Sequence, residues 1–155
     1  MVTTTPIQVP ITGKESIDDP SEPIYALSQF YRAFNNRDLR LMQENWDHSP
    51  DVSLDNPVGG VQRGWERIHG VYQRIFQSAA NVQVEFFDYT LHRAGDFFYA
   101  VGRERGHFAS EGKSLPLSLR TTRIFRFEDG RWRQVHHHGS IDDPQLLSDY
   151  QFALR

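Results

Sequence analysis

The 155-residue chain contains no cysteine. Disulfide bonds, thiolate nucleophiles and sulfur-ligated metals are therefore excluded. Charge of one sign is not in excess either, because 17 Lys and Arg residues stand against 20 Asp and Glu residues, which leaves a formal net charge of −3. Such a balance carries no electrostatic footprint for nucleic acid or for an anionic membrane surface. We therefore expect neither nucleic acid nor a membrane as a partner.

Long apolar runs are also missing, since no stretch approaches the roughly 20 residues of a membrane-spanning helix. The N-terminus, MVTTTPIQVPITGKESIDDPSEP, has no basic region followed by an apolar core, so it does not resemble a secretory signal. A cytoplasmic location is the default expectation. Residues 1–21 mix Thr, Pro, Gly and charge without a period, which is typical of a flexible or extended arm. The length of the chain predicts a single domain over residues 22–155.

The remaining sequence divides into a helical half and a strand-rich half. Apolar residues recur at helical spacing over residues 24–34, 39–46 and 65–76, and Asp38 is suited to cap the second helix. A short strand, DVSLDN, is expected between the second and third helices. After Asn81 the pattern alternates with period two through VQVEFFDYTLHR, DFFYAVGRERGHF, LPLSLRTTRIFRF and RWRQVHHHGSI. This order indicates an α+β fold, with about five to six strands in a curved sheet and three N-terminal helices on one face.

Two arginines occupy strand positions that otherwise carry apolar side chains. The odd-numbered positions of LPLSLRTTRIFRF are mostly apolar and include Arg123, and those of the preceding strand begin with aromatic residues and continue to Arg103. A loop of three or five residues around EGK pairs odd with odd positions, which would bring both arginines onto one face and favour an anion site. The alternative is structural. In that case an arginine pairs with an internal carboxylate such as Asp55 or Glu104, or extends to the rim of the sheet.

Three consecutive histidines lie in the last predicted strand. Alternation sends His136 and His138 to one face and His137 to the other. A two-residue DG turn would place Arg123 on the face of His136 and His138, whereas a three-residue EDG turn with a bulge would place it on the face of His137. From the residues alone, both registers stay open.

A metal site is the sharper alternative for this strand. His136 and His138 could share one ion, with His92 or His107 as a third ligand. No recognised ligand spacing accompanies them, however, and we expect no metal and no cofactor.

The order of elements and three stretches of sequence resemble the nuclear transport factor 2-like superfamily, in particular its SnoaL-like bacterial members. The stretches are YRAFNNRDLRLMQENW, PDVSLDNPVGGVQRGWERI and TTRIFRFEDGRWRQVHHHGS. The last is similar to the end of the association domain of calcium/calmodulin-dependent protein kinase. The resemblance spans about residues 21–141. It implies a cone of curved, mostly antiparallel sheet closed by three helices, with a pocket at the wide end and a homodimer formed through the sheet face.

The resemblance also implies a set of ligand-binding residues. The pocket of the kinase association domain is lined by arginines, two of which match Arg103 and Arg123, while a third falls on Gly139. This favours the bulged turn, with His137 inside the cone. We therefore expect a small-molecule-binding domain whose ligand carries a carboxylate or another anionic group. Its expected ligand-binding residues are Arg103, Arg123, His137, Tyr31, Trp46, Asn56 and Trp65.

Enzymes of the same superfamily offer an alternative function. In ketosteroid isomerase-like members a strand-end Asp before Pro is the general base, and Asn56 in DNPVGG stands at the matching position, where an amide cannot accept a proton. The tyrosine of their oxyanion hole falls near Phe30 and their acidic partner falls at Arg123, so steroid isomerisation is not expected. A cofactor-independent isomerase, dehydratase or cyclase with another acid–base pair stays open. Its candidate catalytic residues are Asp55, His69 and His137.

Overall fold

The computed structural model describes residues 4–155. Its helices are α1 (Pro23–Asn35), α2 (Leu39–Asn45), α3 (Trp65–Gln77) and α4 (Pro144–Ala153). Its strands are β1 (Ser53–Asp55), β2 (Val61–Arg63), β3 (Asn81–Ala94), β4 (Phe97–Ser110), β5 (Lys113–Glu128) and β6 (Arg131–Ile141). They form one sheet in the order β2-β1-β6-β5-β4-β3, in which β1 and β6 are parallel and every other neighbouring pair is antiparallel.

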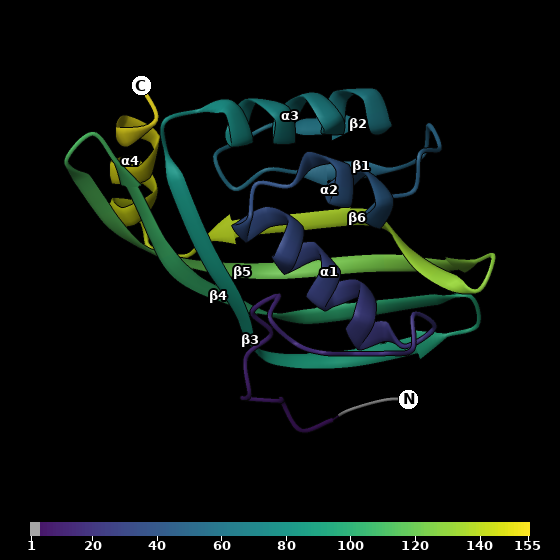
Figure 1. The fold of residues 1–155 in the computed structure, drawn as a ribbon. Helices are drawn as coiled ribbons and strands as arrows, with labels where there is room; N and C mark the ends of the chain where they lie inside the picture. The colour runs from purple at the N-terminus through teal and green to yellow at the C-terminus, as the bar shows by residue number, and fades with distance from the viewer. Residues whose placement is uncertain (1–3) are drawn as a thin grey trace.

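Three of the helices gather on one face of the sheet, and α4 lies at one end of it (Figure 1). This confirms the predicted α+β fold with three N-terminal helices and about six strands; α4 was not predicted. Helix α1 begins with Pro23, at a position where a missing N–H costs nothing. Helix α2 begins after Asp38, whose side chain accepts a hydrogen bond from the backbone N–H of Leu41, as expected for a cap. No helix within residues 4–155 is both long and apolar enough to cross a membrane.

The long strands bend where glycines and a bulge allow it. Gly102 and Gly106 of β4 lie against β3, and a Cβ atom at Gly106 would lie only 1.8 Å from the carbonyl oxygen of Gln83. Strand β3 carries a bulge at Asp88, which has a φ of 50°. Bulges and strand glycines locally increase twist and allow close approach of two backbones, so the sheet curves around the helices.

Residues 4–21 run extended beside β3. The backbone of Ile7 exchanges hydrogen bonds with Tyr89, and that of Ile11 with Phe86, at 2.8 to 3.1 Å. Ile11 is also buried in the core. Glu15 then accepts hydrogen bonds from the backbone around it and from α1. The described part of the arm is thus packed against the domain.

The core fills the space between the inner face of the sheet and helices α1 to α3. Its largest buried side chains are mostly aromatic and include Phe30, Phe86, Phe98, Phe108 and Phe125. One charged residue belongs to the same set: Arg123 is only 1% exposed. A guanidinium at this depth must be paired, because an isolated buried charge is very costly.

Candidate functional site

The loop between β4 and β5 decides which charged side chains meet on the inner face. It consists of Glu111 and Gly112, both with positive φ, and it joins the register partners Ser110 and Lys113. A two-residue loop of this kind pairs odd-numbered with even-numbered positions. Strand β4 therefore turns its even-numbered side chains toward the face that carries Arg123. The buried ones are Phe98, Ala100, Glu104 and Phe108.

The prediction that Arg103 and Arg123 share a face is therefore wrong. Arg103 is the register partner of Arg120 and lies on the outer face of the sheet. Its side chain is 53% exposed and forms an ion pair with Asp88, at 3.0 Å. Because the loop has two residues instead of the expected three or five, the two arginines cannot form one anion site.

Arg123 is paired on all sides. Its Nη2 donates to Oε1 of Glu104 at 2.9 Å, its Nη1 donates to Oε1 of Gln134 at 2.8 Å, and its Nε donates to the hydroxyl of Tyr31 at 3.2 Å. The guanidinium carbon also lies 3.5 Å from the ring centroid of Phe30, in a cation–π contact. The structural alternative, pairing with Glu104, is what the molecule adopts.

The same network ties the sheet to the helices. The Tyr31 hydroxyl donates to Oε1 of Glu104 at 2.8 Å, and Gln134 donates to Asn45, which in turn donates to the backbone carbonyl of Ala26. Burial raises the pKa of Tyr31 well above its usual value, although Arg123 opposes the shift. The hydroxyl therefore stays protonated and acts as a donor. Tyr31 was expected to bind ligand and instead positions the ion pair.

A bulge in β6 determines which histidine faces inward. The turn before it, Asp129-Gly130, is the two-residue form. The register nevertheless shifts by one residue farther along the strand, because Val135 is an extra residue in β6. Arg123 consequently pairs with His137. The inward direction expected for His137 is observed, but the bulge that produces it lies within the strand rather than in the turn.

His137 is buried without hydrogen-bond partners. It is 7% exposed, and within residues 4–155 neither of its ring nitrogens has a partner. Burial holds the pKa of His137 well below the usual 6.5, and the charge of Arg123 adds to this effect, as do His136 and His138. The ring is therefore neutral at pH 7, with one nitrogen able to donate and the other able to accept. An unpaired buried polar group is costly, so a water or a ligand in the cavity would be expected to bond to this ring.

His137 lines a cavity of about 80 Å³. The wall is mainly apolar, with side chains from α1, α3, α4, β3 and β5. The polar side chains of Asn56, Glu104, Arg123 and His137 interrupt it, and the tyrosines Tyr72 and Tyr150 also line it. Oε1 of Glu104 accepts hydrogen bonds from Tyr31 and Arg123, and Glu104 also lines the cavity.

Of the remaining expected site residues, only Asn56 lines this cavity. Trp46 is buried in the core, with its ring centroid 6.5 Å from that of Trp65. Trp65 and His69 lie together on α3, with ring centroids 5.5 Å apart. Asp55 lies on the outer face of the sheet, next to His136 and His138. Asn56 is the one expected residue near β1 that reaches the cavity wall.

Glu104 was named from the sequence as a candidate structural partner of an arginine but was not included among the site residues. A signal was present in DFFYAVGRERGHF, because after Asp96 at its start the even-numbered set contains one charged residue, Glu104, among Phe, Ala and Gly. The odd-numbered set contains Arg103, Arg105 and His107. Counting charges on both faces of the strand would have assigned the even-numbered set to the core.

A curved sheet that carries helices on one face and encloses a cavity beneath them defines this chain as a nuclear transport factor 2-like fold. Residues 25–144 match the family model described as the SnoaL-like domain. Since this match covers most of the chain, the protein belongs to the SnoaL-like domain family.

Solved structures of similar fold agree with this assignment. A proposed dehydratase of the NTF2-like family from Streptomyces avermitilis is 21% identical, with a TM-score of 0.66, over 75% of this chain and 90% of that one. A proposed calcium/calmodulin-dependent protein kinase type II association domain from Thiobacillus denitrificans is 23% identical, with a TM-score of 0.65, over 83% of this chain and 100% of that one. The expected resemblance to both groups is thereby confirmed at the level of fold.

A relative is also found among curated proteins. The F-box protein SKIP8 of Arabidopsis thaliana is 25% identical over 145 residues, which make up 89% of this chain. The match spans only 59% of the length of that protein.

Proposed function

We propose that this domain binds a small, uncharged and mostly apolar organic molecule in the cavity beside His137. The observation that carries the proposal is the buried imidazole, which has no partner on either ring nitrogen and lines the cavity wall. Binding sites commonly combine an apolar wall with a few polar groups that fix orientation. A hydroxyl or carbonyl group on the ligand would satisfy one nitrogen of His137, and its apolar body would contact the wall.

The charges around the cavity favour a neutral ligand over the anionic one that two arginines would have selected. The positive charge of Arg123 is offset by Glu104 at 2.9 Å, and His137 is neutral. A carboxylate in the cavity would meet the negative charge of Glu104 without a free cation to offset it. We therefore propose a small neutral ligand in place of the small anionic ligand that the sequence predicted.

The volume limits the size of the ligand. A cavity of about 80 Å³ has several times the room that one water requires, which is about 10–15 Å³ on the same kind of measure. It is smaller than the cavity of about 150 Å³ that binds benzene in an engineered protein core. The volume supports a ligand of a few non-hydrogen atoms.

Two-dimensional NMR with a pair of matched probes tests the proposal. Propan-2-ol supplies a small neutral apolar body with one hydroxyl, and acetate, which has the same number of non-hydrogen atoms, is its charged counterpart. We expect propan-2-ol to cause saturable shifts at His137 and at the cavity wall, and acetate to cause weaker ones. Leu117→Phe, which fills the cavity from β5, should abolish these shifts, whereas His107→Ala on the outer face should leave them in place. Shifts that persist in Leu117→Phe, or a preference for acetate, would refute the proposal.

An enzymatic role is the second candidate, and one specific observation favours it. A neutral imidazole lines the same cavity as a carboxylate oxygen, which is the kind of pair that can move a proton between two atoms of a substrate. Of the earlier catalytic candidates, only His137 lines this cavity. Turnover of a bound molecule that disappears in His137→Gln, while binding is kept, would establish this role. Unchanged turnover in the variant would exclude it.

We also propose that two copies associate through the outer face of the sheet. Three apolar side chains of β4, Phe97, Tyr99 and Val101, are 41 to 43% exposed there. Ion pairs such as Arg103–Asp88 put both signs of charge on the same surface, so a second copy related by a two-fold axis would find complementary charges. These features support a symmetric dimer rather than an unrelated partner.

A further inference from the structure

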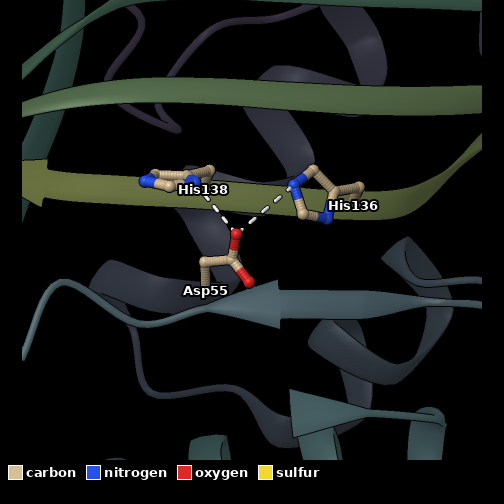
Figure 2. A group of neighbouring side chains, drawn as sticks. All are labelled: Asp55, His136 and His138. Atoms are coloured by element: carbon tan, nitrogen blue, oxygen red, sulfur yellow. Dashed lines mark ion pairs between the residues drawn. The ribbon is translucent and has the colours of Figure 1, made fainter. Parts of the chain in front are cut away.

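The outer face of the parallel pair β1–β6 carries a second group of polar side chains. Asp55 is the register partner of His138, and Ser53 is the register partner of His136. Because His136 and His138 are two residues apart on one strand, both point to the same face. Figure 2 shows the Asp55 carboxylate reaching from β1 to the two imidazoles.

The distances are close to those of a metal site. Oδ2 of Asp55 lies 2.9 Å from Nδ1 of His138 and 3.9 Å from Nε2 of His136. One ligand atom from each residue lies within 4.8 Å of the other two. A tetrahedral ion with bonds of about 2.0–2.1 Å holds its ligand atoms roughly 3.4 Å apart, so small side-chain rotations would complete the geometry.

Ser53 fixes the orientation of one imidazole. Its hydroxyl lies 2.6 Å from Nδ1 of His136, which leaves Nε2 directed toward Asp55. Metal-binding histidines are commonly held in this way, with the second ring nitrogen bonded to a neighbouring group that sets the tautomer. The ring of His136 is therefore presented with one nitrogen bonded and the other turned to the shared centre.

We propose that Asp55, His136 and His138 bind a divalent transition-metal ion, with Zn²⁺ as its representative. Two imidazoles and one carboxylate are a donor set suited to zinc and to other first-row metals. The side chains are 26%, 25% and 56% exposed for His136, Asp55 and His138, so a fourth position stays accessible to water or to an exogenous ligand. The ion would join β1 to β6 on the face opposite the cavity.

This ligand set differs from the one that the sequence suggested. His92 lies on β3, which β6, β5 and β4 separate from β1, and its ring stacks on Tyr99 with centroids 4.6 Å apart. His107 lies on β4. Neither belongs to the cluster, and the third ligand is the carboxylate of Asp55. The cluster depends on the parallel pairing of β1 with β6, which local sequence does not reveal.

Calorimetric titration of metal-free, untagged protein with ZnCl₂ in a non-coordinating buffer tests the proposal. We expect one Zn²⁺ per chain. Asp55→Asn and His138→Gln should each weaken binding by at least the roughly 10- to 100-fold that is typical when only an outer-shell partner is removed. His92→Gln and His107→Gln should leave the affinity unchanged. Circular dichroism establishes that each variant is folded. Binding weaker than millimolar in the wild type, or equal binding in Asp55→Asn, would overturn the proposal.

A second variant tests the orientation of His136. Ser53→Ala removes the hydroxyl but keeps all three ligands, so Zn²⁺ affinity should fall by about 10-fold. Co²⁺ substitution provides an independent readout, because its visible absorption reports the coordination number in the wild type. A tetrahedral spectrum that is lost in His138→Gln and kept in His92→Gln supports the site. An octahedral spectrum that is the same in all variants would mean that the ion binds elsewhere.

Discussion

Nη2 of Arg123 and Oε1 of Glu104 lie 2.9 Å apart in the centre of the domain, on neighbouring strands of the inner face. Their side chains are 1% and 7% exposed. A pair buried this deeply gains little net free energy from its formation, but removing one partner leaves an uncompensated charge in the core. The pair therefore favours the register of β4 and β5 that places Glu104 beside Arg123.

Replacing Glu104 should strongly destabilise the fold. We expect Glu104→Leu to lower the free energy of unfolding by about 3–5 kcal/mol, because Arg123 would be buried without its counter-charge. Urea denaturation followed by circular dichroism measures the loss. The matched control is Glu85→Leu, which removes a carboxylate from an exposed pair with Arg105. It should cost no more than about 1 kcal/mol.

The double variant Glu104→Leu/Arg123→Met separates loss of the pair from exposure of a lone charge. Because both charges are removed, we expect it to be more stable than Glu104→Leu alone. If the double variant loses as much stability as Glu104→Leu and Arg123→Met lose together, the isolated charge is not the cause. The interpretation of the pair would then be wrong.

The neutral His137 should give stability a specific dependence on pH. Since its pKa is lowered by folding, the unfolded chain binds a proton below about pH 6.5 while the folded chain does not. The free energy of unfolding should then fall as the pH decreases from about 6.5 to 5, by at most about 1.4 kcal/mol per pH unit from this residue. Arg123, His136 and His138 contribute to the lowered pKa, and Glu104 lines the same cavity.

Denaturant titrations of the wild type and His137→Leu across this range provide the measurement. The stability difference between them should change with pH, with the wild type losing more stability on the acid side. His107 lies outside the cavity. His107→Gln should therefore keep the part of the pH dependence of the unfolding free energy that we attribute to His137. A pH-independent difference between the wild type and His137→Leu would contradict the assignment of a neutral buried ring.

Two glycines should respond in opposite directions to the same substitution. At Gly106 a Cβ would lie 1.8 Å from the carbonyl oxygen of Gln83, so Gly106→Ala must separate β3 from β4 and should cost about 1–3 kcal/mol or more. At Gly70, inside α3, the nearest atom to a Cβ is Nη1 of Arg74 at an ordinary 3.5 Å. Gly70→Ala should therefore stabilise the domain by about 0.5–1 kcal/mol through helix propensity. Thermal unfolding checks both, and equal effects would contradict the close approach of β3 and β4.

Periodicity predicted the order of helices and strands, because each long element carries its own amphipathic pattern. The pairing of faces could not be predicted in the same way, since it depends on one-residue differences in loops and bulges. A two-residue Glu111-Gly112 loop placed Glu104 rather than Arg103 on the same face of the sheet as Arg123. In β6 the extra residue Val135 shifted the register with β5 by one residue. His137 rather than His136 and His138 therefore points inward.

The outer cluster was beyond prediction for a different reason. Asp55 and His138 are 83 residues apart and meet only because a three-residue strand pairs in parallel with β6. Short strands carry too few residues for a periodic signal. Parallel strands are not joined by a hairpin turn, so no turn motif in the sequence indicates their pairing. The carboxylate could be recognised as a candidate, but its partners could not.

The proposed dimer depends on the apolar stripe of β4, and a single charge placed in the stripe should disrupt it. Val101 is 42% exposed between Thr90 and Thr122 on the outer face. Light scattering at micromolar concentration should give about twice the chain mass of 18.0 kDa for the wild type and the single-chain mass for Val101→Lys. Two lysines facing each other across a two-fold axis would repel, and the lost apolar contact would add to this effect. Val61→Lys is the matched control, because Val61 is 46% exposed on β2, which β1, β6 and β5 separate from β4. A wild-type mass near 18.0 kDa, or a dimer that Val101→Lys leaves intact, would show that this face is not the interface.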